Sequence, residues 1–162
     1  MKSHLCDYFH DTITAMTQEQ QKALIQKGRE FIGRPYKYGA TSDEAPQVFD
    51  CSSFTQYLFK QIGAIIPRST IEQATQGVTV QLKSIELGDL IFFHGSRGHY
   101  NPTFPQGIGH VVLYIGDNKI IHAGSRRIQE QPNIIEVGGV EELDFKEVVE
   151  KLGPIIVIKR II

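Results

Sequence analysis

The sequence FDCSSFTQYLFKQIG, residues 49–63, predicts an amphipathic helix that begins at a cysteine. Phe54, Leu58 and Ile62 recur at i, i+4 and i+8 and form one apolar stripe, which must pack against the rest of the chain. Cys51 lies three residues before Phe54 and therefore on the same inward face. Cys51 is either a small core residue or a nucleophile, and its surroundings must decide between the two.

A helix is expected on each side of this segment. TQEQ, residues 17–20, has the form of a capping box, and apolar residues follow at helical spacing as far as Ile32. STIE, residues 69–72, has the same form at the start of a short helix that ends near Gly77. Residues 36–49 are rich in Gly, Pro, Ser and Asp and predict a loop that leads into Cys51.

The second half of the chain changes to the branched residues and alternation that are typical of strands. Residues 145–152 are amphipathic and can form a further helix. Strands are expected over residues 90–93, 110–115, 119–123, 134–137 and 154–162. Because helices come first and strands with short connections follow, the sequence predicts an α+β fold, with N-terminal helices packed on a central antiparallel β-sheet.

Length and charge limit the classes of function. A chain of 162 residues predicts a single domain over residues 1–162, with residues 1–16 as an N-terminal extension. The formal net charge of -1 gives no electrostatic reason to expect a nucleic-acid partner or an anionic membrane surface. No apolar run has membrane-spanning length or the form of an export signal. As written, the chain is expected in the cytoplasm, unless a dedicated route exports it or a leader has been removed.

Cys51 has the surroundings of a reactive thiol. The unpaired N–H groups and the dipole at a helix N-terminus stabilise an anion, so we expect a lowered pKa and a thiolate. A lone cysteine is more often a small buried residue, so this interpretation requires a proton acceptor nearby. Cys6 and Cys51 are the two cysteines, too few for a disulfide framework, and both are expected to be free thiols.

Two histidines in adjacent predicted strands can supply that acceptor. His110 opens one strand, and a three-residue turn at 116–118 places His122 of the next strand opposite Val112. The two histidines are then diagonal neighbours on one face, about 7–8 Å apart at the backbone. His122 can bind one nitrogen of His110 and direct the other toward Cys51. A slip of one residue would put the two rings on opposite faces.

A zinc site is the competing interpretation of the same residues. Cys51, His94, His99, His110 and His122 include enough ligands for zinc. The sequence offers no CxxC and no close pair of histidines with chelate spacing, which disfavours a metal centre. We therefore expect neither a metal nor another cofactor.

Six segments resemble the NlpC/P60 cysteine peptidases, papain-like enzymes that cut peptide bonds in bacterial cell-wall stems. In order, they are PYKYGA, FDCSSFTQYLF, IPRST-IEQ, LGDLIFF, GHVVLYIG and IIHAGS, within about residues 34–125. The resemblance implies the papain-like NlpC/P60 fold. It also implies that Cys51 is the nucleophile, His110 the base, and His122 the third residue, which orients His110.

The resemblance also implies positions that bind substrate. Tyr36 matches a tyrosine that lines the cleft ahead of the nucleophile, and it can equally be a loop aromatic that covers the helix. Asp50 and Ser52 flank Cys51 in the family pattern. Arg68 lies in the PR-S segment, where it can bind a substrate carboxylate or form a structural ion pair.

The sequence departs from the family pattern at three positions. Ser53, Ala40 and Val112 stand where the family commonly has glycine. No catalytic atom is lost, but the added side chains are expected to narrow the cleft and change substrate preference. Residues 94–108 form a further difference, either as one wall of the substrate site or as a surface loop.

The expected function is therefore a cysteine endopeptidase that hydrolyses amide bonds in peptidoglycan stem peptides or muropeptides. The resemblance implies γ-D-glutamyl–diamino acid bonds, cut by Cys51, His110 and His122. Two alternatives stay open: a related amidase or acyltransferase acting on another amide or a lipid, and a non-catalytic wall-binding module. The sequence does not indicate an oligomeric state.

Overall fold

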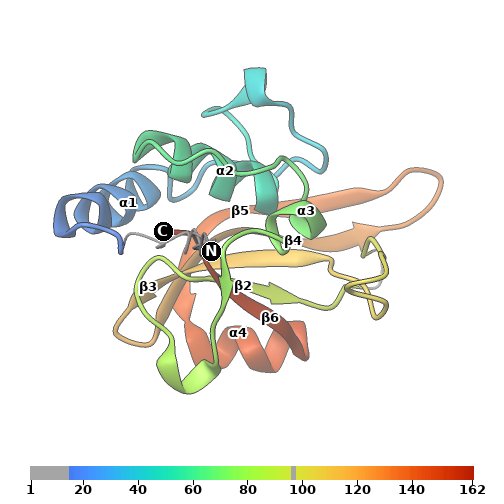
Figure 1. Cartoon of the computed structure of the whole chain (residues 1–162). Coiled ribbons are helices and arrows are strands. Elements are labelled where there is room, and N and C mark those ends of the chain that lie inside the picture. The colour runs from blue at the N-terminus through green and yellow to red at the C-terminus, as the bar shows by residue number, and fades with distance from the viewer. Residues whose placement is uncertain (1–14, 96–97) are drawn as a thin grey trace, which may run out of the picture.

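The computed structural model describes residues 15–95 and 98–162, and it is an antiparallel sheet covered by helices on both faces. Figure 1 shows α1 and α2 on one side of the sheet and α4 on the other. The helices are α1 (Gln18–Glu30), α2 (Cys51–Gln61), α3 (Thr70–Gln73) and α4 (Phe145–Leu152). The strands are β1 (Val78–Thr79), β2 (Leu90–Phe93), β3 (His110–Gly116), β4 (Lys119–Gln129), β5 (Ile135–Asp144) and β6 (Ile155–Arg160).

The strands lie in the order β1-β6-β2-β3-β4-β5, and each neighbouring pair is antiparallel. The predicted α+β fold is confirmed. Two apolar clusters hold the layers together. Leu24 of α1 and Phe54 of α2 belong to the cluster on one face, and Val148 of α4 packs with Val112 and Ile158 on the other.

The helix starts follow from side-chain caps. Thr17 accepts from the Gln20 backbone N–H while the Gln20 side chain accepts from the Thr17 N–H, which confirms the predicted capping box. Asp50 caps α2 by accepting from the Ser53 N–H at 2.8 Å, so the helix begins at Cys51 as expected. Ser69 caps α3 in the same way.

The hairpin between β3 and β4 differs from the prediction at its turn. The expected three-residue turn at 116–118 is wrong, because Gly116 pairs with Lys119 across a two-residue turn. Asp117 and Asn118 have φ values of 50° and 58°, the left-handed conformation that such turns require. A register shift between Tyr114 and Gly116 compensates.

Beyond this shift, Leu113 pairs with Ile121, so the next positions along the strands, Val112 and His122, follow in the expected register. The predicted alignment of the two histidine strands therefore holds although the turn differs. The irregularity adds one unpaired residue to β3, and this compensates for a turn that is one residue shorter than predicted.

Two strands are longer than the sequence predicts. β4 continues to Gln129, and β5 covers 135–144 where only 134–137 was expected. Together they form a long hairpin that projects from the sheet (Figure 1). Gly138 and Gly139 interrupt the alternation of β5 in the sequence, but Gly139 lies against the carbonyl of Arg34, where a side chain would not fit.

The predicted N-terminal extension, residues 1–16, falls mostly outside the described residues. Met16 is described and packs against the cluster beneath α1. In residues 15–95 and 98–162, we find no helix with the length and apolar character needed to cross a membrane.

Candidate active site

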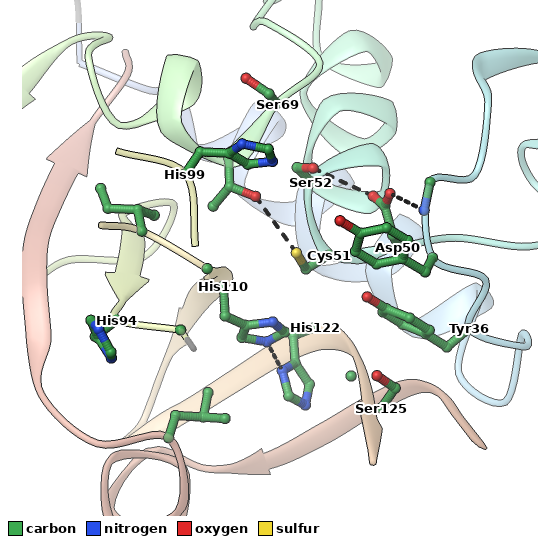
Figure 2. Close-up of a pocket in the computed structure, with 18 of the residues that line it drawn as sticks. Tyr36, Asp50, Cys51, Ser52, Ser69, His94, His99, His110, His122 and Ser125 are labelled. Atoms are coloured by element: carbon green, nitrogen blue, oxygen red, sulfur yellow. Dashed lines mark hydrogen bonds between the residues drawn. The ribbon is translucent and has the colours of Figure 1, made fainter. Parts of the chain in front are cut away.

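Cys51 lies at the first position of α2, at the edge of a cleft of about 380 Å³. The cysteine is only 7% exposed. The cleft brings together all seven residues that the sequence singled out: Tyr36, Asp50, Cys51, Ser52, Arg68, His110 and His122. They come from α2 and the segments on either side of it, and from β3 and β4, which lie beneath (Figure 2).

The two histidines form a direct hydrogen bond, with 2.8 Å between Nε2 of His110 and Nδ1 of His122. Their rings are perpendicular, and His122 is only 5% exposed. Figure 2 shows the His110 ring between Cys51 and His122. Because Nε2 of His110 binds His122, Nδ1 is the nitrogen available on the side of the thiol.

Gly124 makes room for the His122 ring. A Cβ atom at position 124 would lie 2.7 Å from both Cε1 and Nε2 of His122, closer than side-chain atoms can approach. The absence of a side chain two residues after His122 therefore allows the ring to lie where it does. The IIHAGS segment contains this glycine, but its role follows only from the structure.

Burial raises the pKa of the Cys51 thiol, and the negative charge of Asp50 raises it further. Three donors oppose the rise: the Thr70 hydroxyl, whose Oγ1 lies 3.7 Å from the sulfur, and the backbone N–H groups of Val111 and Ser52. The predicted lowering of the thiol pKa is therefore wrong. The helix N-terminus is present as expected, but burial beside a carboxylate outweighs it.

The pKa of His110 moves in the opposite direction, down to about 3. Burial of the ring is the larger cause and the neighbouring His122 the smaller, since both disfavour the charged imidazolium. At neutral pH the resting site therefore holds a neutral thiol beside a neutral imidazole.

Arg68 holds Asp50 in place. Its Nη2 donates to the Asp50 carboxylate and to the Ala40 carbonyl, each at 2.5 Å, and its Nη1 donates to Ser52 Oγ at 2.8 Å. The structural ion pair, one of the two expected roles of Arg68, is thus present. Its side chain is 34% exposed and lines the cleft, and a contact with substrate stays a prediction.

Tyr36 lines the cleft, and its hydroxyl is protonated at neutral pH. Burial raises the pKa of this phenol, and the Asp50 carboxylate and the Cys51 sulfur, once ionised, act in the same direction, whereas a hydrogen bond with Ser125 opposes the rise. Its backbone N–H donates to the Gly138 carbonyl at 3.0 Å, which anchors the residue to β5. The phenol is therefore available as a hydrogen-bond donor at neutral pH.

The three departures from the family pattern do not narrow the cleft. Ala40 is fully buried, Val112 packs on the α4 side of the sheet, and Ser53 hydrogen-bonds to the backbone of Asp50. None of them lines the cleft, so the expected effect on its width is wrong. The loop after β2 does contribute a wall, through His94, Gly95, His99 and Ile108.

Two residues that contact Cys51 and His122 were not predicted from the sequence. Thr70 contacts the sulfur from the first turn of α3, and Glu141 of β5 places Oε1 3.1 Å from Nε2 of His122. The capping box drew attention to Thr70 only as a helix residue. Glu141 carried no signal, because β5 was expected to end before it.

The competing interpretation, a zinc site, would need several His, Cys, Asp or Glu side chains grouped around one point. In the part of the chain that the structure describes, we find no group of three or more His, Cys, Asp or Glu side chains arranged to hold a metal ion.

The model of the NlpC/P60 family matches residues 33–141. The chain belongs to the NlpC/P60 family. Two curated relatives illustrate the match. A Bacillus cereus protein named gamma-D-glutamyl-L-lysine dipeptidyl-peptidase is 38% identical over 122 residues, which cover 74% of this chain and 33% of the relative. A probable endopeptidase of Haemophilus influenzae is 39% identical over 113 residues, 69% of this chain and 60% of the relative.

Solved structures give the same fold. An NlpC/P60 family protein from Bacillus cereus has a TM-score of 0.66 at 29% identity, covering 87% of this chain and 40% of that one. The peptidoglycan hydrolase RipB from Mycobacterium tuberculosis has a TM-score of 0.62 at 26% identity, covering 89% and 65%. The chain spans 33% to 42% of the length of the first curated relatives.

The contact between Thr70 and Cys51 predicts how the thiol ionises. Thr70→Val keeps the shape of the side chain and removes a donor to the sulfur anion, so the thiol pKa should rise. A rise of about one pKa unit corresponds to roughly 1.4 kcal/mol and lowers the thiolate fraction at pH 7, so alkylation of Cys51 by iodoacetamide should slow by up to about tenfold. Peptide mapping by mass spectrometry follows the modification of Cys51.

Thr70→Ser retains the hydroxyl and is the matched control, which should react at close to the native rate. An alkylation rate in Thr70→Val equal to or above the native rate would contradict this role for Thr70.

Proposed function

We propose that this chain is a cysteine endopeptidase that cuts peptidoglycan stem peptides between a γ-D-glutamyl residue and a diamino acid. The observation that carries the proposal is the 2.8 Å bond between His110 and His122 in a cleft that also contains Cys51. A nucleophile, a base and a residue that orients the base are the three parts of a thiol hydrolase. The names of the relatives supply the substrate class.

In the proposed first step, the sulfur of Cys51 attacks the carbonyl carbon as its proton passes to Nδ1 of His110. The oxyanion that forms is stabilised by backbone N–H groups at the start of α2, such as that of Cys51. His110 then gives the same proton to the departing amine nitrogen, and the C–N bond breaks. A thioester between Cys51 and the acyl half of the peptide remains.

The second step reverses the roles. Water attacks the thioester carbonyl while His110 takes a proton from it, and the returning proton restores the Cys51 thiol as the acid product leaves. His122 keeps the His110 ring in position through both steps. No external oxidant, reductant or cofactor is required for this balance.

The remaining residues of the cleft have proposed supporting roles. Tyr36 donates from a protonated hydroxyl and positions the acyl group. Asp50 and Ser52, held by Arg68, shape the wall next to the nucleophile and contact the substrate. Because both terminal nitrogens of Arg68 already donate within the protein, we assign it chiefly to holding Asp50 in place.

Purified muropeptides, analysed by mass spectrometry after incubation, test this function. The native chain should release products cut after the γ-D-glutamyl residue, and Cys51→Ala should abolish turnover while its circular dichroism and melting temperature stay native. Cys6→Ala removes the other thiol of the sequence and should keep full activity. Iodoacetamide should inactivate the native chain and Cys6→Ala alike.

Full turnover by Cys51→Ala would overturn the mechanism. Cys51-dependent turnover of acyl lipids, with no cutting of muropeptides, would favour the acyltransferase alternative. Binding of stem peptides without any cutting would favour a wall-binding module.

The lowered pKa of His110 predicts activity at acidic pH. The base form of His110 persists as the pH falls, because its pKa of about 3 lies far below that range. We expect kcat/KM to change by less than about twofold between pH 7 and pH 5, whereas an imidazole with the ordinary pKa of ~6.5 would lose about 25-fold. The measurement is the pH profile of kcat/KM, with circular dichroism as the check that the protein stays folded. A loss near 25-fold in folded protein would contradict the assignment.

A further inference from the structure

Glu141 continues the row of hydrogen bonds that begins at His110. β4 and β5 pair so that His122 and Glu141 stand directly opposite each other. Oε1 of Glu141 lies 3.1 Å from Nε2 of His122, and Nδ1 of the same ring lies 2.8 Å from Nε2 of His110. His122 is therefore held at both nitrogens, by Glu141 on one side and by His110 on the other.

The carboxylate fixes which nitrogen of His122 carries the proton. The hydrogen bond from His122 lowers the pKa of Glu141, so at neutral pH this side chain is an anion that can only accept. Nε2 of His122 must then be the donor, and in a neutral ring Nδ1 is left as an acceptor. Nε2 of His110 has to donate to that acceptor, which leaves Nδ1 of His110 without a proton.

We propose that Glu141 is a positioning residue that sets the tautomers of both histidines, so that the free lone pair of His110 is on the nitrogen nearest Cys51. The readout in catalysis rests on the proposed function above, while the positions of the protons can be observed in the unreacted protein. Without the carboxylate, the hydrogen bond between the rings can run in the reverse direction. Nδ1 of His110 would then carry a proton and be unable to accept the one from the thiol.

The surroundings of Glu141 limit the size of the effect. The groups that act on it are His122 from β4 and Lys151 from α4, whose positive charge also favours the carboxylate. Its side chain is 53% exposed, so water screens its charge and can partly replace it. Gly124 leaves the space in which the His122 ring makes both bonds. Glu141 therefore acts mainly by setting the direction of the hydrogen bonds through the two rings, and less through its negative charge.

Glu142 provides a matched control on the same strand. It is the next residue of β5, and it bonds to Arg29 of α1 at 2.8 Å, on the opposite side of the sheet from His122. Glu142→Ala removes a carboxylate and its ion pairs with Arg29 and Lys119 from β5, and it leaves the hydrogen bonds of the two histidines in place. A loss of activity that is caused by weakening of the strand should appear in this variant as well.

The experiment combines kinetics with histidine NMR on the full chain. In Glu141→Ala we expect kcat on muropeptides to fall about tenfold, at the low end for residues that orient a catalytic or ligating histidine, with KM within about twofold of the native value. Glu141→Gln should recover part of kcat, because its carbonyl can accept from His122 but its amide can also donate. Glu142→Ala should keep kcat within about twofold.

Long-range ¹H–¹⁵N correlation spectra at neutral pH report the proton positions directly. In the native protein, Nε2 of both His110 and His122 should carry the proton, and Nδ1 of both should be unprotonated. In Glu141→Ala the signals of both rings should move toward the other tautomer, while in Glu142→Ala they should not. A structural role alone would not change this pattern.

Unchanged tautomers in Glu141→Ala, or a native ring with the proton on Nδ1 of His110, would overturn the proposal. If the native chain cuts no muropeptide, the proposed function fails, and the NMR spectra still decide the role of Glu141. If the native chain is active and Glu141→Ala matches it in kcat and in its spectra, only the role of Glu141 fails.

Discussion

The hydrogen bond between His110 and His122 depends on the register of the β3–β4 hairpin, because side chains alternate between the two faces of a strand. A shift of one residue would separate the rings and leave Cys51 beside an unsupported imidazole. The two-residue turn alone would produce such a shift, and the irregularity between Tyr114 and Gly116 corrects it. The tight turn and the bulge thus have to occur together for the site to exist.

Burial determines how this site can work. An exposed thiol at a helix N-terminus would favour a standing anion, but Cys51 is enclosed and lies next to Asp50. The same enclosure keeps His110 neutral. The site therefore holds a proton on sulfur and a lone pair on nitrogen, and in the proposed mechanism charge separates only when the sulfur attacks a carbonyl group. Because Arg68 neutralises Asp50, the acid that caps α2 does not remain as an unpaired buried charge.

The parts of the structure that were predicted from sequence are those that local patterns determine. The cap at Thr17, the helix that begins at Cys51, and the strand that begins at His110 all follow from residues within a few positions. The α+β fold and family membership followed from the order of the elements and from the motifs. The resemblance also placed Tyr36 and Arg68, both of which line the cleft.

The rest depends on contacts between distant parts of the chain. Glu141 meets His122 only because β5 extends past Gly138 and Gly139, whose lack of side chains conceals the strand in the sequence. Whether the pKa of the Cys51 thiol is raised or lowered depends on how deeply the start of α2 is buried. No local sequence pattern reports that depth. The cleft was expected to be narrowed by the side chains of Ser53, Ala40 and Val112. The packing of the helices on the sheet places these side chains away from the cleft instead.

The protonation state of Cys51 tests the central claim most directly. The difference in ultraviolet thiolate absorbance between the native chain and Cys51→Ala, followed from pH 5 to pH 10, isolates this one sulfur. A neutral thiol beside a neutral His110 predicts no thiolate signal at pH 7 and a rise only above the ordinary thiol pKa of about 8.5. A full thiolate signal already present at pH 6 would contradict the account, because the site would then hold a standing ion pair.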